Sequence, residues 1–214
     1  MAGADSAQDT TGASRSVEVE LKFDADDETP LPDWSALPGV TSVGPPEVRE
    51  LDARYLDTAE LAMAAAGYAL RRRSGGPDAG WHIKGPRVEG GRVELGWPLG
   101  EDAVEGVPDA VRAAVATVGV AEGALQPIAR IRNTRTAYAL RSDEGLVAEF
   151  VDDRVTATDM RTGVVRTWRE WEIELAPDAP VAPGPFFAAV EAAVLAAGGR
   201  AAASDSKLAR ALGY

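Results

Sequence analysis

The chain contains no cysteine, and its 214 residues include a single histidine. Without cysteine there can be no disulfide and no thiolate metal site, which fits a reducing compartment. No apolar run approaches the roughly 18 residues that a membrane-spanning helix needs, and the start of the chain lacks the basic and then apolar pattern of a signal peptide. These absences predict a cytoplasmic protein that does not bind membranes.

Positive charge is also scarce, because 22 Lys and Arg residues stand against 34 Asp and Glu residues and the formal net charge is −12. Affinity for a nucleic-acid backbone relies on clustered Lys and Arg, so the composition argues against nucleic acid as a partner. It leaves room for a local basic pocket. Nothing in the sequence chooses between a monomer and a homodimer.

Length and composition favour one domain. A hydrophobic fraction of 45% is enough for a proper core in a chain of this length. Residues 1–14 are small and polar, and we expect them to form a disordered leader. Because no repeat and no domain-scale linker follows, residues 15–214 are expected to form a single domain.

The most informative segment is Val17 to Lys22, which reads Val-Glu-Val-Glu-Leu-Lys. In a β-strand, alternate side chains share a face, so Glu18, Glu20 and Lys22 would lie about 7 Å apart in a row. Residues 171–175 repeat the pattern with a second pair, Glu172 and Glu174. If the two strands are neighbours, their four carboxylates converge, and carboxylate oxygens are ligands for a hard divalent cation.

Charged residues of opposite sign are segregated along the chain. Carboxylates occupy the first and last predicted strands, whereas the middle strands carry the cations Arg71, Arg73, Lys84 and Arg135. Arg92 and Glu94 stand at alternate positions of one strand, as do Glu149 and Asp153 of another, so the two members of each pair would share a face. Charges of a solvated sheet face would produce the same alternation, but that face favours opposite signs side by side. The segregation therefore favours a site for a polyanion and its metal ion.

The periodicity predicts an antiparallel α+β fold with about eight strands and three or four helices. We expect strands at about 17–24, 49–56, 68–74, 80–85, 91–98, 128–141, 146–158 and 164–176, and helices at about 59–66, 108–118, 186–197 and 205–212. Eight strands can close into a barrel just wide enough for side chains or one small ligand. A dry lumen full of ions would be costly, so a closed barrel implies a wet, charged tunnel with its apolar strand faces turned outward and covered by helices.

Taken together, these motifs resemble those of the CYTH superfamily, the triphosphate tunnel metalloenzymes, in residue type and in order. This superfamily includes class IV adenylate cyclases, thiamine triphosphatases and inorganic triphosphatases, and the resemblance leans toward the triphosphatases. The motifs that carry it are Glu18-Val19-Glu20-Leu21-Lys22, Tyr55-Leu56-Asp57-Thr58, Leu70-Arg71-Arg72-Arg73, Trp81-His82-Ile83-Lys84, Arg92-Val93-Glu94, Thr134-Arg135-Thr136, Asp152-Asp153-Arg154-Val155, Glu172-Ile173-Glu174 and Ser206-Lys207-Leu208.

The resemblance implies a closed eight-stranded antiparallel β-barrel that binds a small triphosphate with Mg²⁺ or Mn²⁺. The implied metal ligands are Glu18, Glu20, Glu94, Asp153, Glu172 and Glu174. The implied triphosphate-binding residues are Lys22, Arg71, Arg73, Lys84, Arg92, Arg135 and Lys207. The implied catalytic residues are Glu18, Glu20, Lys22 and Asp153. Asn133 stands where relatives often carry a basic residue.

Three functions stay open at this point. The resemblance favours a metal-dependent triphosphatase acting on inorganic triphosphate, thiamine triphosphate or a nucleoside triphosphate. A class IV-type adenylate cyclase is the alternative within the enzymes, and a triphosphate- or polyphosphate-binding module without turnover is the alternative outside them. His82 has the parity of Lys84, and we weigh a polar-lining role above proton transfer for it.

Overall fold

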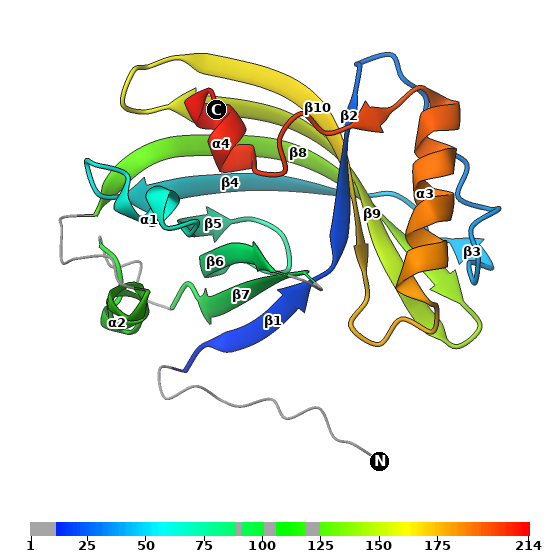
Figure 1. The fold of residues 1–214 in the computed structure, drawn as a ribbon, viewed down its shortest axis with the longest axis horizontal. Coiled ribbons are helices and arrows are strands. Elements are labelled where there is room, and N and C mark those ends of the chain that lie inside the picture. The colour runs from blue at the N-terminus through cyan, green and yellow to red at the C-terminus, as the bar shows by residue number, and fades with distance from the viewer. Residues whose placement is uncertain (1–11, 89–90, 101–105, 119–124) are drawn as a thin grey trace.

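Strands dominate the structure, as the period-two pattern predicts (Figure 1). In the computed structural model, the described residues are 12–88, 91–100, 106–118 and 125–214. They form eleven strands: β1 (Ser14–Glu18), β2 (Glu20–Ala25), β3 (Ser42–Val43), β4 (Glu47–Asp57), β5 (Ala69–Ser74), β6 (Gly80–Val88), β7 (Gly91–Pro98), β8 (Gln126–Ser142), β9 (Gly145–Asp159), β10 (Val165–Leu175) and β11 (Arg200–Ala201). The same residues form four helices: α1 (Ala62–Ala65), α2 (Asp109–Thr117), α3 (Pro183–Ala197) and α4 (Lys207–Leu212).

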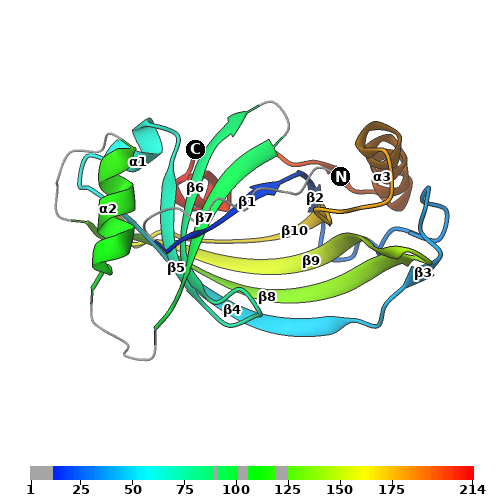
Figure 2. The ribbon, with the colours of Figure 1, turned by 90° about the horizontal axis from the view of Figure 1, so that it is seen from below.

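All strands belong to one antiparallel sheet, ordered β1-β7-β6-β5-β4-β8-β9-β10-β2-β11, with β3 paired to β8. The two ends of this order are neighbours in the chain, because only Val19 separates β1 from β2. β1 pairs with β7, and β2 pairs with β10. Figure 2 shows β6 and β7 facing β8 and β9 from the opposite side. The strand count exceeds the expected eight because the first strand is interrupted and because β3 and β11 contain two residues each.

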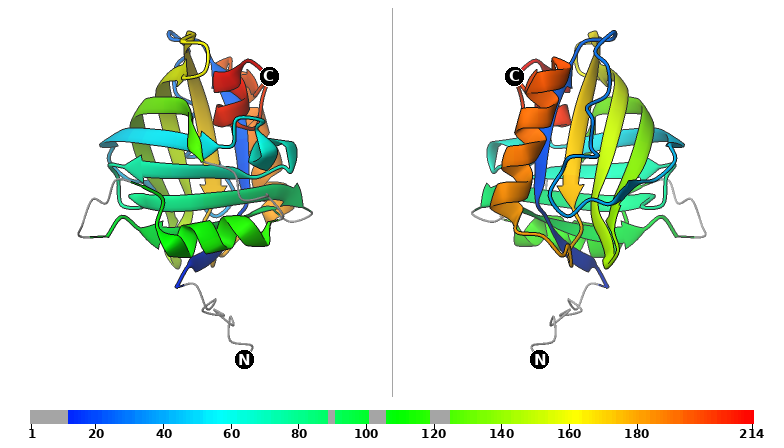
Figure 3. Two further views of the ribbon diagram at one scale, coloured as in Figure 1. Left: turned by 90° about the vertical axis from the view of Figure 1, so that its left-hand side faces the viewer. Right: turned by 90° about the vertical axis from the view of Figure 1, so that its right-hand side faces the viewer.

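One apolar core lies on the outer side of the sheet under α3. Phe186, Val190 and Val194 recur every four residues along α3, so they share one helix face, and all three are fully buried. They pack against Trp171 and other outward side chains of β2, β9 and β10. Gly198, in the left-handed region at φ 95°, ends the helix. Figure 3 (right) shows α3 along the outside of β2 and β10.

A second outer core lies under α2, whose Val111, Ala114 and Val115 are buried against β5, β6 and β7. The short helix α1 packs at its margin and is fixed by Asp57, which is 1% exposed. The Asp57 carboxylate accepts hydrogen bonds of 2.9 Å from the backbone N–H groups of Met63 and Ala64. The acid of the Tyr55–Thr58 motif is therefore a helix-capping residue.

The fourth helix corrects the expectation that every helix packs outside the sheet. Leu208, Ala211 and Leu212 of α4 pack against a cluster of β4, β8 and β9 side chains that includes Ala53 and Ile131. Leu208, Ala53 and Ile131 also line the interior cavity, so α4 lies on the inner side of the sheet. The interior is consequently charged in its middle and apolar beneath α4.

The position of β1 bears on the expected N-terminal leader. β1 begins at Ser14, inside the leader that we expected to reach residue 14, and residues 1–11 lie outside the described part of the chain. None of the helices in the described residues is long and apolar enough to span a membrane.

Candidate active site

Glu20 on β2 and the pair Glu172 and Glu174 on β10 lie on neighbouring strands, whereas Glu18 ends β1, which pairs with β7. In the antiparallel register of β2 and β10, Glu174 is opposite Glu20 and Glu172 is opposite Lys22. The side chains of all four residues line one interior cavity of about 110 Å³, which we name the tunnel chamber. The convergence that the alternating pattern predicted is therefore present.

The tunnel chamber gathers nearly all of the predicted site residues. Those that line it are Glu18, Glu20, Lys22, Arg71, Arg73, Lys84, Arg92, Arg135, Glu172, Glu174 and Lys207. Asp153 and Glu94, the remaining two, are buried behind this lining and contact its cations. The chain has only three lysines, Lys22, Lys84 and Lys207, and all three belong to this group.

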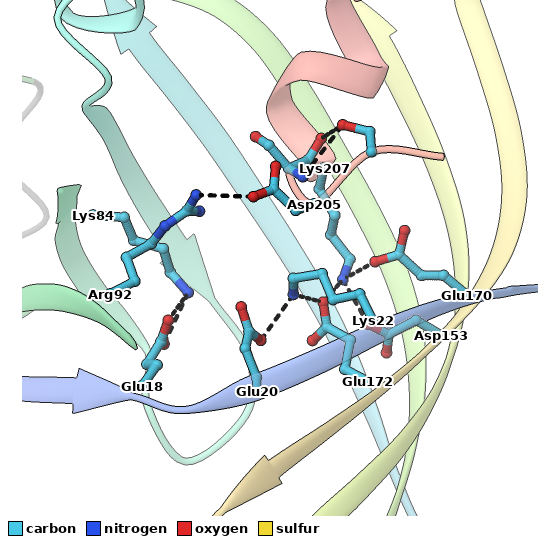
Figure 4. A network of polar contacts seen from close by, with 12 residues as sticks. Glu18, Glu20, Lys22, Lys84, Arg92, Asp153, Glu170, Glu172, Asp205 and Lys207 are labelled. Carbon is cyan, nitrogen blue, oxygen red and sulfur yellow. Dashed lines mark hydrogen bonds and ion pairs between the residues drawn. The ribbon is translucent and has the colours of Figure 1, made fainter. Parts of the chain in front are cut away.

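One half of the chamber is organised around Glu94 and Lys84, and Figure 4 shows the contact of Lys84 with Glu18. Lys84 Nζ donates to both carboxylate oxygens of Glu18, at 2.8 and 2.7 Å, and lies 3.0 Å from Glu94. Glu94 also contacts Arg71 Nη2 at 3.4 Å and the ring of His82. In this half, therefore, the carboxylates of Glu18 and Glu94 are both already paired with the Lys84 ammonium.

The other half is organised around Glu172, which is held by three cations. Arg135 donates to Glu172 at 2.9 Å and to both oxygens of Asp153 at 2.8 and 2.7 Å. Lys207 Nζ lies 2.6 Å from Glu172, and Lys22 bridges Glu172 and Glu20. These cations hold the pKa of Glu172 well below its usual value, although burial alone would raise it.

Sequence reasoning missed Glu170. It lies on β10, is 4% exposed and contacts Lys207. Carboxylate oxygens of Asp153, Glu170 and Glu172 lie within 4.8 Å of one another, which makes these three the group best placed to share a cation in the described part of the chain. The predicted grouping of Glu18, Glu20, Glu172 and Glu174 differs from this one. The signal was available, because Glu170 has the parity of Glu172 and Glu174.

Two aspartates from loops were also missed. Asp205, just before α4, lies 3.7 Å from Arg92 and 3.5 Å from Arg87. Asp78, in the turn between β5 and β6, pairs with Arg73. Both aspartates line the tunnel chamber. Their sequence neighbourhoods are turn-like and carry no period-two pattern, so parity gave no signal for them.

Several cations of the chamber keep unused hydrogen-bond capacity. The buried Nε atoms of Arg71, Arg73 and Arg92 have no hydrogen-bond partner among the described residues, and neither has Asn133 Oδ1. A buried, unpaired N–H group is costly and rare in proteins. Three such groups lie around one cavity and are donors that a ligand with several acceptor atoms could use.

Electrostatics inside the chamber are uneven. Burial lowers the pKa of Arg73 to about 9, and the neighbouring cations Arg71 and Arg135 add to the effect. At the opposite side Glu174 has no ion pair within the described residues. Enclosure by the protein, followed by the like charges of Glu18 and Glu20, raises the pKa of Glu174, although more than a third of this residue stays exposed. An anion is therefore favoured at one side and a cation at the other.

Comparison with known proteins identifies the family of the chain. The CYTH domain profile matches residues 16–195. This chain belongs to the CYTH family. It is 35% identical over 211 residues to two uncharacterised proteins of Mycobacterium tuberculosis, one from strain CDC 1551 and one from strain H37Rv. The alignment covers 94% of the chain but 41% of those proteins, so the chain spans about two fifths of their length.

Solved CYTH-like structures share the fold. A candidate adenylate cyclase from Bacillus halodurans superposes with a TM-score of 0.62 at 13% identity, covering 92% of this chain and 97% of that one. A Hippeastrum protein described as an adenylyl cyclase candidate with a dominant triphosphatase activity gives a TM-score of 0.50 at 18% identity, covering 90% and 93%. At these identities the likeness concerns the fold alone.

Proposed function

We propose that this CYTH protein is a metal-dependent hydrolase of a small triphosphate, which it binds in the tunnel chamber. The observation that carries the proposal is the composition of that chamber. Seven cations, among them all three lysines of the chain, surround it together with a cluster of buried carboxylates. A bound triphosphate carries about four negative charges, and guanidinium forks match phosphate oxygens in pairs.

The cations supply binding and positioning. Arg71, Arg73 and Arg92 would turn their unpaired N–H groups to the phosphate oxygens, and Lys22, Lys84, Arg135 and Lys207 would exchange part of their contacts with carboxylates for contacts with phosphate. Phosphoryl transfer needs little covalent help from a protein, so position and charge neutralisation provide most of the acceleration. In the overall reaction water adds to the terminal phosphorus and the bond to its bridging oxygen breaks.

The carboxylates fit a hard divalent ion. Asp153, Glu170 and Glu172 present only oxygen ligands, which suits Mg²⁺ or Mn²⁺ rather than a metal that prefers sulfur or imidazole. Glu18, Glu20 and Glu174 would hold a second ion or share the first one. An ion held by these carboxylates would supply positive charge against the negative charge of the phosphates. Lys207 now occupies the acid cluster, so its ammonium would move toward the phosphates when an ion binds.

We also propose that the sheet closes into the eight-stranded barrel expected from the sequence. The support is the position of β1 and β2, which are separated by one residue and pair with opposite ends of the strand order. With the N-terminal stretch counted as one strand, and with β3 and β11 left out, eight strands surround the chamber.

A second cavity supports an organic triphosphate alongside the inorganic one. It measures about 530 Å³ and adjoins the chamber, because Lys84 and Arg92 line both. Its other walls include Leu61 and Tyr68, which flank α1, and Leu212 of α4. Ligand pockets of this size and character hold flat organic groups. The chamber itself, at about 110 Å³, has room for phosphates and little more.

Two alternatives are testable against this proposal. A cyclase would convert ATP without releasing free phosphate, and the CYTH-like structures include cyclase candidates. A binding module without turnover would need the cations but not the acid cluster, so the buried carboxylates argue against it. The triphosphatase activity described for the Hippeastrum protein favours hydrolysis.

The deciding experiment is a turnover assay with inorganic triphosphate, thiamine triphosphate, ATP and long-chain polyphosphate, each with Mg²⁺ and with Mn²⁺. We expect phosphate release from at least one small triphosphate and its loss in Glu20→Ala. Glu144→Ala, in the exposed turn between β8 and β9, is the matched control and should keep full activity. Measurable triphosphate binding without phosphate release from any substrate would overturn the hydrolase; cyclic AMP formed from ATP would replace it with a cyclase.

A further inference from the structure

His82, the single histidine, is buried in the wall of the tunnel chamber with 7% of its surface exposed. Its Nε2 lies 3.0 Å from the backbone carbonyl oxygen of Asp78, and its Nδ1 contacts the carboxylate of Glu94. Both ring nitrogens are therefore engaged with the protein. A ring held in this way has no nitrogen left for a phosphate or an attacking water, so proton transfer to the substrate is not its role.

The two groups that His82 contacts are the same groups that hold the cations of β5 and β6. Arg73 Nη2 donates to the Asp78 carbonyl oxygen at 3.3 Å and also pairs with the Asp78 carboxylate. Glu94 contacts Arg71 at 3.4 Å and Lys84 at 3.0 Å. Each of these three cations thus shares an acceptor residue with the His82 ring.

The backbone around His82 leaves a slot for the ring. A Cβ atom at Gly80 would lie 3.3 Å from His82 Nε2 and would collide with the Trp97 carbonyl group. On the neighbouring strand, a Cβ atom at Gly96 would meet His82 Nδ1 at 3.8 Å. The ring is therefore flanked by two positions that lack side chains, and its orientation is set by its two polar contacts.

The turn between β5 and β6 is otherwise held by Arg73, which contacts Asp78, and by close packing of Gly75 against the backbone of Glu50. Gly75 and Gly76 adopt φ values of +79° and +75°, a region that glycine enters freely. Asp78, the residue that reaches Arg73, follows directly after this pair and Pro77, and its side chain is 58% exposed. Without the His82 contact, the Asp78 carbonyl would lose its buried anchor to β6.

We propose that His82 is a positioning residue of the triphosphate site. His82 joins the β5–β6 turn to Glu94 and so holds the side chains of Arg73, Arg71 and Lys84 where they would contact the phosphates. The proposal rests on the proposed function, since it assigns these cations to triphosphate. Preorganised cations bind an anion more tightly because less side-chain freedom is lost on binding.

Three substitutions separate the two contacts. The amide nitrogen of His82→Asn takes the place of Nδ1 and keeps the contact to Glu94, whereas that of His82→Gln takes the place of Nε2 and keeps the contact to Asp78. His82→Phe fills the slot and keeps neither. Arg72→Gln, on the opposite face of β5, is the matched control outside the chamber.

The affinity of each variant for inorganic triphosphate is measured by isothermal titration calorimetry in EDTA, so that no turnover is needed. We expect Kd to rise about tenfold in His82→Phe, by smaller factors in His82→Asn and His82→Gln, and not at all in Arg72→Gln. With the substrate that the wild type hydrolyses, KM should rise in the same order while kcat changes by less than about threefold. Melting temperatures measured in parallel identify any loss that follows from unfolding.

The outcomes distinguish failure of the proposed function from failure of the role of His82. A wild type that binds no triphosphate in EDTA and releases no phosphate from it with Mg²⁺ or Mn²⁺ overturns both the proposed function and the role of His82. A wild type that binds, with His82→Phe binding equally well, overturns only the role of His82. That role also fails if all three variants lose the same affinity and their melting temperatures fall by the same amount. His82→Asn and His82→Gln would then keep no more binding than His82→Phe, and the loss would follow from unfolding. A collapse of kcat at unchanged KM would instead assign His82 to proton transfer.

Discussion

Lys207 Nζ, near the end of the chain, lies 2.6 Å from Glu172 Oε1 in the middle of β10. The same ammonium is 3.0 Å from Asp153 and also contacts Glu170, so one lysine contacts all three acids of the cluster. These acids in turn raise the pKa of Lys207 well above its usual value, although burial opposes the charged form. Helix α4 is therefore attached to the chamber through the residues that would hold a metal ion.

Replacing Lys207 by Met should lower stability and increase the response to metal. The change leaves buried carboxylates without their cation, which costs about 3 kcal/mol. It also removes a competitor for the cluster. We therefore expect a lower melting temperature in EDTA and a larger rise on addition of Mn²⁺ than in the wild type, as measured by scanning calorimetry. Equal Mn²⁺ responses in the two proteins would show that the ion binds elsewhere.

Among side chains, an amine-acylating reagent should label only residues of the chamber, because the three lysines of the chain, Lys22, Lys84 and Lys207, all line it. Inorganic triphosphate should protect all three from an acylating reagent, as read by peptide mass spectrometry. Lys22 and Lys207 have raised pKa values, so few of their amines are unprotonated and both should react slowly even without ligand. The terminal amine serves as the internal control, and its labelling should not respond to triphosphate. Unchanged lysine labelling with ligand present would contradict binding in the chamber.

Glu170→Gln tests the acid that sequence reasoning missed. If Glu170 shares a divalent ion with Asp153 and Glu172, its loss should reduce the stabilisation by Mn²⁺ and lower kcat/KM by about 10- to 100-fold. Glu191→Gln, on the exposed side of α3, is the matched control and should behave as the wild type. A normal Mn²⁺ response in Glu170→Gln would restrict the ion to the other carboxylates.

Asp159, the last residue of β9, should make the free energy of unfolding depend on pH. Hydrogen bonds from Arg161 of 2.9 and 3.0 Å lower the pKa of Asp159 to about 2. Because the folded value is depressed, the stabilisation is complete above the unfolded value of about 4 and is lost as the pH falls toward 2. Asp159→Asn should therefore cost about 1 kcal/mol at pH 7, a modest amount because Arg161 is partly exposed, and almost nothing at pH 2. Urea unfolding at both pH values measures it; an equal cost at each would contradict the linkage.

Alternating residue types predicted much of this molecule. The period-two pattern placed Glu18 and Arg71 on the inner face of the sheet, where both line the chamber. Period-two patterns work here because one sheet face meets water and charge while the other meets an apolar core. The helices were found through their apolar faces and through terminators such as Gly198.

Three features were beyond that reasoning. The break at Val19 depends on the chain passing from one strand partner to another, which is a tertiary event without a local signal. The inner position of α4 follows from the apolar patch of Ala53 and Ile131 facing inward at one end, and parity does not say which stretch of a face is covered. Asp78 and Asp205 enter the chamber from loops, whose conformation is set by the strands around them.

The two large apolar cores, under α2 and α3, both lie on the outside of the sheet. Apart from the apolar cluster beneath α4, apolar packing and the charged residues of the chamber consequently lie on opposite faces of the same strands. Substitution of a lining residue can therefore change what the chamber recognises while the two outer cores keep their packing.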